Sequence, residues 1–526
     1  MSAMASNLRQ VLWVDDEIDL LTAHFRFLKE RGYEVTGAHS GDDALGHLDK
    51  QRYDLVLLDE QMPGMDGLST LEQIKRRDPN LPVVMVTKSE EEQIMDEAIG
   101  KKIDDYLTKP VNPSQILSVI KRHVEKRKIR SEHLAKQYVA DFNHLRENLS
   151  PNADWTEWVD AHRSLSQWDL DLDLFVNLGL DQTHRDHKRE WNAEFGRWVE
   201  REYPQWMANI DNDKRPPLSV DVVPKYLVPH LKAGRKVYFF VIDCMRSDQW
   251  FNIESELAEY FTIDREFYFS LLPSATPFSR NAIFSGLTAD EIQRLYPELW
   301  QIGDKDEFSR NRLERQLLDQ QLDRLGVRLP SEAKYVKVLD FAEGESIDKK
   351  FSSYKDTPLL SVVYNFLDHL THGRTEHELL YELAPDEAAF RGLMKTWFVN
   401  SSWFKVLRKI ARDPNAVAIV TTDHGSILGS RGTVAHGRRD TSPSLRYKFG
   451  DTLKCDTKDG VIIKDPREYR LPTFTMSTTY LLAKEDFYFV YPTNFNEYQR
   501  KFANTFLHGG ISMPEMILPV ATLTPK

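Results

Sequence analysis

Short apolar runs alternate with an amphipathic stretch and with polar segments over the first 125 residues of the chain. The apolar runs cover Val11–Val14, Leu55–Leu58, Leu81–Val86 and Tyr106–Leu107, and the clearest amphipathic stretch is Leu20–Lys29. Parallel strands joined by crossover helices produce this alternation, and the site of such a sheet lies at the carboxyl ends of its strands. We therefore predict a doubly wound (βα)5 domain over residues 8–125.

The pattern changes twice further along the chain. Residues 126–212 lack strand-like runs, hold six of the eleven tryptophans, and place Trp191, Phe195, Trp198 and Val199 at helical spacing, which predicts a helical bundle. The run Asp211–Pro217 ends in two prolines and is typical of a linker. Strand-like runs then return at Val237–Ile242, Leu359–Tyr364 and Ala416–Val420. They predict a second α/β domain over residues 218–526.

Composition narrows the class of protein. A chain of 526 residues is too long for one hydrophobic core, so roughly two to four domains are expected. The 81 acidic residues exceed the 69 basic ones and give a formal charge of −12, which argues against a large non-specific nucleic-acid surface. With only Cys244 and Cys455, neither a disulfide framework nor a cysteine zinc site is expected, and a cytoplasmic location fits. No membrane segment is expected, because a membrane helix needs roughly 20 apolar residues.

Polar residues follow the apolar runs of the first domain. They are Asp15, Asp16, Asp59, Thr87 and Lys109. The ends of parallel strands meet at one edge of a sheet, so three carboxylates, a hydroxyl and an ammonium group should converge there. Carboxylates can hold Mg²⁺ while one of them accepts a phosphoryl group, whose charge magnesium and Lys109 would offset. Each acidic residue alone is more often a helix cap than a ligand, but the full set favours a phosphoryl site.

These residues, together with Met62–Gly67, Tyr106 and Pro110, resemble the receiver domain of two-component response regulators. The resemblance implies that a cognate histidine kinase phosphorylates Asp59. It also implies that Mg²⁺ binds Asp15, Asp16, Asp59 and the backbone carbonyl of Gln61. The implied switch uses Lys109, the hydroxyl of Thr87, which turns toward the phosphoryl group, and the ring of Tyr106, which moves inward. For Tyr106, an ordinary half-buried aromatic residue remains the alternative.

A second set of polar residues occurs in the C-terminal domain, each beside an apolar run or a glycine-marked loop. They are Asp243, Thr276, Asp368, His372, Asp423, His424 and His508. Two aspartate and histidine sets with one hydroxyl suit a pair of cations, because carboxylates neutralise charge and imidazoles suit zinc. Thr276 stands where a helix should begin, which favours an anionic oxygen and a nearby phosphate. We predict hydrolysis of a phosphate ester, although Asp243 and Thr276 could each be a helix cap, and His369 offers the same chemistry as His372.

The order of these seven residues resembles that of the alkaline phosphatase superfamily, and within it the PglZ domain. The resemblance implies an α/β domain with a mixed, mainly parallel sheet and two zinc ions. One zinc would be held by Asp243, Thr276, Asp423 and His424, and the other by Asp368, His372 and His508. Thr276 would be the nucleophile, and His369 drops out as a ligand. Nearby candidates for substrate binding are Arg280, Asn281, His436 and Arg438.

A receiver, a helical bundle and a PglZ domain in this order resemble a family of response regulators associated with type IX secretion. This resemblance implies a zinc-dependent phosphodiesterase for linear and cyclic oligonucleotides, in a protein that forms a homodimer on phosphorylation. It also permits an adaptor with a structural zinc site, for instance one that binds a sigma factor. Direct binding of duplex DNA is the least favoured class, since the acidic chain has no helix-turn-helix signature or basic stripe.

Overall fold

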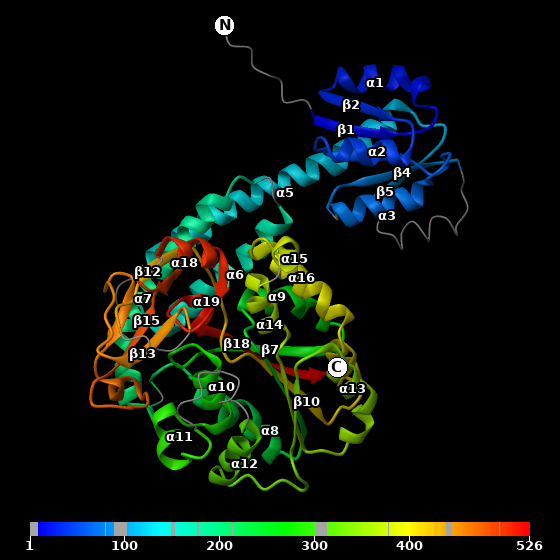
Figure 1. The fold of residues 1–526 in the computed structure, drawn as a ribbon. Helices are drawn as coiled ribbons and strands as arrows, with labels where there is room; N and C mark the ends of the chain where they lie inside the picture. Colours follow the sequence, from blue (N-terminus) through cyan, green and yellow to red (C-terminus); the bar gives the residue numbers. More distant parts are fainter. Residues whose placement is uncertain are drawn as a thin grey trace. The chain divides into compact units, whose positions relative to one another are not determined.

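The chain divides into two compact units, Met1–Ala140 and Asp141–Lys526 (Figure 1). The structure is a computed structural model, and it describes residues 9–78, 80–88, 103–148, 153–175, 178–212, 214–300, 313–376, 378–437, 444–493 and 495–526. Among the described residues, none of the helices contains a stretch long and apolar enough to cross a membrane.

The first unit contains a five-stranded sheet in the order β2-β1-β3-β4-β5. All of its pairs are parallel, which confirms the predicted doubly wound receiver-type fold. Its strands are β1 (Arg9–Val14), β2 (Tyr33–Ala38), β3 (Leu55–Asp59), β4 (Val83–Thr87) and β5 (Asp105–Thr108), and its helical elements include η1 (Ile18–Leu21), α1 (Thr22–Lys29), α2 (Gly41–Leu48), α3 (Gly67–Arg77) and the start of α5 (Pro113–Asn148).

Successive residues of β1 serve two separate cores. Leu12 and Val14 belong to the core on one face of the sheet, and Val11 and Trp13 belong to the core on the other. A strand points successive side chains to opposite faces, and helices cover both faces here, so every position must be apolar. This is why the inner strands β1, β3 and β4 contain continuous apolar runs, whereas the edge strands β2 and β5 include polar residues.

Helix α5 runs without a break through the domain boundary predicted between residues 125 and 126. The chain has neither glycine nor proline between Pro113 and Pro151, so nothing in its local chemistry ends the helix there. From Asp141 onward its residues belong to the second unit.

The second unit is organised around a six-stranded sheet in the order β7-β18-β10-β6-β9-β8. Strands β10, β6, β9 and β8 are parallel, and β18 runs antiparallel between β10 and β7. The three predicted apolar runs form β6, β9 and β10, and the sheet is mixed, as expected. Its strands are β6 (Lys236–Ile242), β7 (Phe261–Phe269), β8 (Lys334–Val338), β9 (Leu359–Tyr364), β10 (Ala416–Thr421) and β18 (Ile517–Pro525).

Helices and smaller sheets surround this central sheet. The α-helices are α6 (Trp155–Leu174), α7 (Asp181–Ala208), α8 (Val228–Lys232), α9 (Ser247–Leu257), α10 (Thr276–Ser285), α11 (Ala289–Leu295), α12 (Glu314–Arg324), α13 (Phe341–Lys350), α14 (Phe366–Glu376), α15 (Glu378–Leu383), α16 (Glu387–Asn400), α17 (Ser402–Ile410), α18 (Phe495–Phe502) and α19 (Met513–Met516). The smaller sheets are formed by β11 (Ile427–Gly429) with β17 (Thr505–Leu507), by β12 (Arg431–Val434) with β16 (Phe487–Val490), and by β13 (Tyr447–Asp451), β15 (Thr478–Ala483) and β14 (Gly460–Ile463).

The tryptophans of α6 and α7 form an aromatic core with the end of β7. Ring centroids of Trp158 and Trp198 lie 5.6 Å apart, and Trp206 meets Phe269 at 5.5 Å. Trp198 also lies 6.0 Å from Phe269. The helical spacing read from the sequence therefore marks the face of α7 that packs on the second unit's sheet, and the tryptophans serve core packing.

Removing the ring of Phe269 tests this packing. Phe269→Ala should lower the free energy of unfolding of the second unit by about 3 to 5 kcal/mol, because a buried ring and its contacts are lost. Urea titration followed by tryptophan fluorescence measures the effect. Phe341→Ala is the matched control, since Phe341 is 72% exposed and its loss should cost less than about 0.5 kcal/mol. Equal effects of the two substitutions would contradict the proposed packing.

Candidate metal and phosphoryl sites

The carboxyl ends of neighbouring strands in the second unit carry the predicted ligand residues. Asp243 directly follows β6, and Asp423 with His424 comes just after β10. Strand β6 lies between β10 and β9 and is parallel to both, so these loops meet at one edge. Asp368 and His372 lie on α14, which follows β9, and His508 follows β17. The parallel pairing of three strands thus gathers residues that are far apart in the sequence.

Six of the seven predicted zinc ligands gather in two clusters. One consists of Asp243, Asp423 and His424, and the other of Asp368, His372 and His508. Within each cluster the ligand atoms lie within 4.8 Å of one another. The two clusters adjoin, since the rings of His424 and His508 stack with centroids 4.2 Å apart. The arrangement has the donor set of a two-cation site.

The first cluster is buried and short of positive charge. Asp243 is 1% exposed, and Asp423 and His424 are 0% exposed. Neither Asp243 Oδ1 nor Asp423 Oδ2 accepts a hydrogen bond from the described residues. Burial, and then the charge of Asp243, raise the pKa of the Asp423 carboxyl well above its usual value. Buried carboxylate oxygens without donors are costly unless a cation faces them, so the donor set fits a metal ion.

The imidazole of His424 is oriented by its own loop. Its Nδ1 lies 3.0 Å from the carbonyl oxygen of Gly425, which can only accept, so Nδ1 carries the proton. The lone pair of Nε2 therefore faces the site, as is usual for a histidine that binds a metal. That Nε2 lies 3.0 Å from the hydroxyl oxygen of Thr276.

Thr276 is the first residue of α10, and the N-cap is Ala275. The side chain of Thr276 therefore does not cap the helix, which was the alternative role expected from the sequence. Its hydroxyl lies beside the first cluster and at the N-terminus of α10, where the helix dipole favours a negative oxygen. The structure therefore joins all seven predicted residues in one place.

The second cluster is partly open to solvent. The side chain of His372 is 55% exposed, and its Nε2 lies 3.3 Å from Asp368 Oδ1 and from His508 Nε2. Burial alone would raise the pKa of Asp368, but the hydrogen bond to His372 and the facing His508 hold the pKa well below its usual range. An ionised carboxylate and two imidazoles suit zinc. A ligand can reach the paired clusters from the side of His372. His369 is exposed and stands outside the cluster.

Arg280 is placed to orient the metal residues rather than a substrate. Its guanidinium is 1% exposed and lies 2.7 Å from Asp243 Oδ2, 3.6 Å from Asp423 Oδ2 and 2.8 Å from Glu314 Oε1. Asn365 also donates to Asp243 Oδ2, at 2.7 Å. Sequence reasoning offered Arg280 as a substrate contact and overlooked Glu314 and Asn365. This burial argues against direct contact between Arg280 and a substrate.

The other proposed substrate contacts differ in their placement. Asn281 is fully buried, and its side-chain amide donates to the carbonyl of Pro277 at 3.0 Å. His436 is exposed, and its backbone pairs with that of Lys454. Arg438 lies outside the described residues. The burial of Asn281 indicates a role within α10, whereas His436 is accessible.

The phosphoryl residues of the first unit also converge. Asp15, Asp16 and Asp59 form a cluster that could hold a metal ion, and Lys109 Nζ lies 2.8 Å from both Asp15 Oδ2 and Asp59 Oδ2. Burial raises the pKa of Asp59, although the hydrogen bond from Lys109 opposes it. Asp16 is exposed, as is Gln61, and both line one open pocket. Magnesium fits this set, because hard cations prefer carboxylate and carbonyl oxygens.

The two predicted switch residues occupy defined positions. The hydroxyl of Thr87 donates to the buried carboxylate of Glu60, and the ring of Tyr106 is 44% exposed. Glu60 directly follows Asp59 in sequence, but no pattern singled it out. In this structure Glu60 is therefore one partner of the Thr87 hydroxyl, and the Tyr106 ring is partly exposed to solvent.

Three family models match consecutive parts of the chain. A response regulator receiver domain matches residues 11–121, a PorX response regulator linker domain matches residues 128–207, and the BREX system PglZ alkaline phosphatase-like domain matches residues 223–523, more than half of the chain.

Individual relatives resemble the chain over a limited part. The alkaline phosphatase synthesis transcriptional regulatory protein PhoP of Bacillus subtilis is 32% identical over 115 residues, which is 22% of this chain and 47% of PhoP. The transcriptional regulatory protein ResD of the same organism is 29% identical over 196 residues, which is 36% of this chain and 80% of ResD. The chain therefore spans about half the length of PhoP.

Solved receiver domains are similar as well. A CheY-like receiver domain protein from Methanospirillum hungatei has 28% identity and a TM-score of 0.23, with coverage of 24% of this chain and 99% of that chain. The receiver domain of NtrX from Brucella abortus has 32% identity and a TM-score of 0.21, with coverage of 22% and 98%. With its receiver, linker and phosphatase-like parts in this order, the chain belongs to the PglZ alkaline phosphatase-like family and is a PorX-like response regulator.

Proposed function

We propose that this response regulator is a zinc-dependent phosphodiesterase, with Thr276 as nucleophile, whose activity is controlled by phosphorylation of Asp59. The observation that carries the proposal is the hydroxyl of Thr276, 3.0 Å from His424 Nε2 and beside two adjoining clusters of metal-ligand residues. A buried hydroxyl at a helix N-terminus, next to unsatisfied carboxylate oxygens, is placed for attack on a phosphate.

The residues of the two clusters would hold two zinc ions. Asp243, Asp423 and His424, with Thr276, would bind one ion, and Asp368, His372 and His508 would bind the other. When bound, the zinc ions would favour loss of the Thr276 proton and neutralise the charge of the phosphate. The ionised state of Asp368 and the inward Nε2 of His424 both support this assignment.

The remaining work falls to residues of the chain itself. Thr276 Oγ1 would form a bond to phosphorus while one ester bond breaks and its oxygen leaves as an alcohol, which gives a threonine phosphodiester that still carries the other ester group. Water would then break the bond between phosphorus and Thr276 Oγ1 and release a phosphate monoester. Arg280 and Asn365 would hold Asp243 in place through their 2.7 Å contacts. The N-terminus of α10 would stabilise the charge that develops on the phosphate through its helix dipole. A phosphodiester would enter from the exposed side of His372.

Linear and cyclic oligonucleotides are the substrates that the family resemblance favours, and type IX secretion is the process it implies. A cognate histidine kinase would phosphorylate Asp59, with Mg²⁺ held by Asp15, Asp16, Asp59 and the carbonyl of Gln61. Phosphorylation would release Thr87 from Glu60 toward the phosphoryl group, draw Tyr106 inward and favour a homodimer. The adaptor role toward a sigma factor is the outcome favoured if no hydrolysis is found.

The nucleophile is tested by Thr276→Val, which removes the hydroxyl and keeps the shape of the side chain. We expect turnover of bis(p-nitrophenyl) phosphate and of short linear and cyclic dinucleotides to fall by at least about a thousandfold. Zinc content, measured by mass spectrometry of the metal, should stay largely intact. Thr396→Val is the control, because Thr396 is exposed on α16. Wild-type turnover in the Thr276 variant would show that Thr276 is not the nucleophile.

Dimerisation is tested with beryllofluoride, which mimics a phosphoryl group on an aspartate. Beryllofluoride and Mg²⁺ should bind at Asp59, because it lies beside Lys109 and two further carboxylates. If this binding mimics phosphorylation, we expect the mass from light scattering to double. Asp59→Asn should abolish the change, and Asp19→Asn, at an exposed acidic residue of the same unit, should not. An unchanged mass of the wild-type protein would argue against phosphorylation-driven dimerisation.

A further inference from the structure

The helices of the linker segment, α6 and α7, contact loops of both metal clusters. His162 of α6 lies 3.1 Å from the hydroxyl of Ser247, four residues after Asp243. Asn192 of α7 accepts a hydrogen bond at 2.8 Å from the backbone amide of Met513, five residues after His508. Tyr203 of α7 accepts one at 2.9 Å from the amide of Leu272, in the segment that leads to Thr276. The linker helices therefore touch three segments that lead to or from the predicted catalytic residues.

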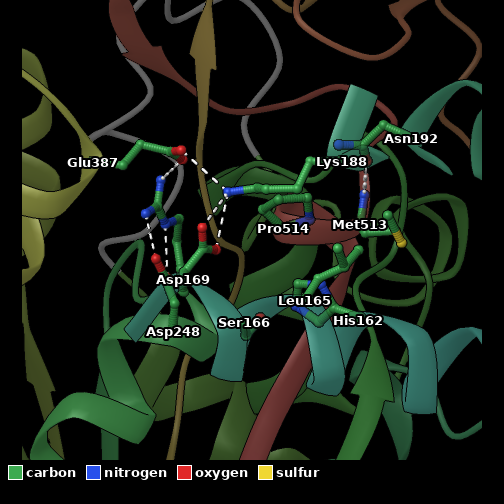
Figure 2. A pocket seen from close by; sticks show the side chains of 11 residues that line it. His162, Leu165, Ser166, Asp169, Lys188, Asn192, Asp248, Glu387, Met513 and Pro514 are labelled. Carbon is green, nitrogen blue, oxygen red and sulfur yellow. Dashed lines mark hydrogen bonds and ion pairs between the residues drawn. The ribbon is translucent and has the colours of Figure 1, made fainter. Parts of the chain in front are cut away.

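A buried network of ion pairs also connects α6 and α7 to the segment that follows Asp243 (Figure 2). Lys188 of α7 binds Asp169 of α6 at 3.0 Å and Glu387 of α16 at 3.2 Å. The other oxygen of Glu387 accepts at 2.7 Å from Arg246, which also binds Asp248. Arg246 is 2% exposed and stands three residues after Asp243. The carboxylate of Glu387 thus connects the ammonium group of Lys188, on α7, to Arg246, in the segment that follows the predicted metal ligand Asp243.

Arg246 also lies against the loop of the other two ligands of the first cluster. A side chain at Gly425, directly after His424, would overlap the carbonyl of Pro514 and lie 3.5 Å from Arg246 Cγ. Gly425 N donates to the carbonyl of Glu515 at 3.2 Å. The loops that follow β6, β10 and β17 are therefore packed tightly around Arg246, so a shift of this side chain would disturb them together.

Arg391 adds a second set of ion pairs to the network and links Asp248 to α6. Arg391 binds Asp173 of α6 at 2.7 Å and Asp248 at 2.8 Å. Three cations, Lys188, Arg246 and Arg391, thus face the carboxylates of α6, α9 and α16. Buried networks with satisfied partners fix one arrangement of the elements they join, whereas removal of one charge leaves its partners uncompensated.

We propose that the linker helices α6 and α7 set the zinc affinity of the metal site, through the Lys188–Glu387–Arg246 network and the bonds of α7 to the His508 loop. Residues that hydrogen-bond to metal ligands change metal affinity by roughly 10- to 100-fold when they are lost. This network acts through the segment from Asp243 to Arg246, so the effect of its loss should lie at the lower end of that range. In this role Lys188 and Asn192 are positioning residues, since neither touches the reacting atoms. The proposal rests on the proposed zinc function and assigns the linker its part in it.

The last turns of α5 pack on the same two helices. Asp141 accepts from the indole of Trp168 on α6 at 3.1 Å, and the ring of Phe142 lies 5.3 Å from that of Trp191 on α7. Phe142 also meets His184, which binds Asp169 of the network at 3.2 Å. The last turns of α5 thus pack against the two helices that carry the network.

The test measures zinc affinity of the full chain by competition with a chromophoric chelator. Lys188→Met should weaken zinc binding about tenfold, and Lys188→Arg, which keeps the charge, should bind within about twofold of wild type. Lys225→Met is the matched control, because Lys225 forms an exposed pair with Glu266 on the same unit. Asn192→Leu keeps the branching of the side chain but cannot accept the hydrogen bond from Met513 N. It should also weaken zinc binding, and it provides a second test should Lys188→Met fail to fold.

A purely structural role would give a different pattern. It would lower the unfolding temperature of Lys188→Met but leave the zinc affinity of the folded protein unchanged, and that result overturns the inference while the proposed function stands. Wild-type protein that binds no zinc would overturn both. By reciprocity, zinc should slow hydrogen exchange along α7 in the wild-type chain and less so in Lys188→Met.

Discussion

Two buried carboxylates at the ends of adjacent parallel strands are the constraint on which the second unit depends. Asp243 and Asp423 follow β6 and β10, and each is almost fully inaccessible to water. Their mutual repulsion must be balanced by positive charge. Arg280 supplies part of it, in contact with both and with Glu314. A cation facing Asp243 Oδ1 and Asp423 Oδ2, which accept no hydrogen bond from the described residues, would supply the rest.

The same requirement explains the arrangement around the site. Asp243 needs a fixed position, so Asn365 donates to it from the end of β9. His424 needs a defined tautomer, which the carbonyl of Gly425 provides. The His508 loop needs support as well, and Glu515 gives it, since this fully buried carboxylate accepts from Gly510 N and binds Arg446. Asp243 and the His508 loop are thus held by partners from other parts of the chain, and His424 by its own neighbour.

Sequence patterns predicted the strands and the ligand types because both depend on local chemistry. The runs of β6, β9 and β10 are almost wholly apolar, with Ser361 of β9 as the exception, because both faces of these strands are buried, and their polar end residues stand out. The partners of these residues could not be predicted in the same way. Glu314 lies 34 residues from Arg280, and Asn365 lies 122 residues from Asp243, so only the folded chain brings them together.

Two further features of the fold were not predicted from the sequence, each for a physical reason. Strand β18 lies between two other strands although it contains Pro519, and a proline normally argues against an inner strand. Helix α5 continues past the predicted domain boundary because no breaker interrupts it. The outline of both sites was therefore accessible from residue type and order, whereas their supporting residues were not.

The two-cation assignment is tested most directly by anomalous diffraction at the zinc absorption edge from crystals of the full chain grown with zinc. We expect two anomalous peaks, one among Asp243, Asp423 and His424 with Thr276 alongside, and one among Asp368, His372 and His508. Crystals of Asp423→Asn should lose or weaken the first peak and keep the second. Anomalous peaks elsewhere in the chain, with neither cluster occupied, would contradict the assignment.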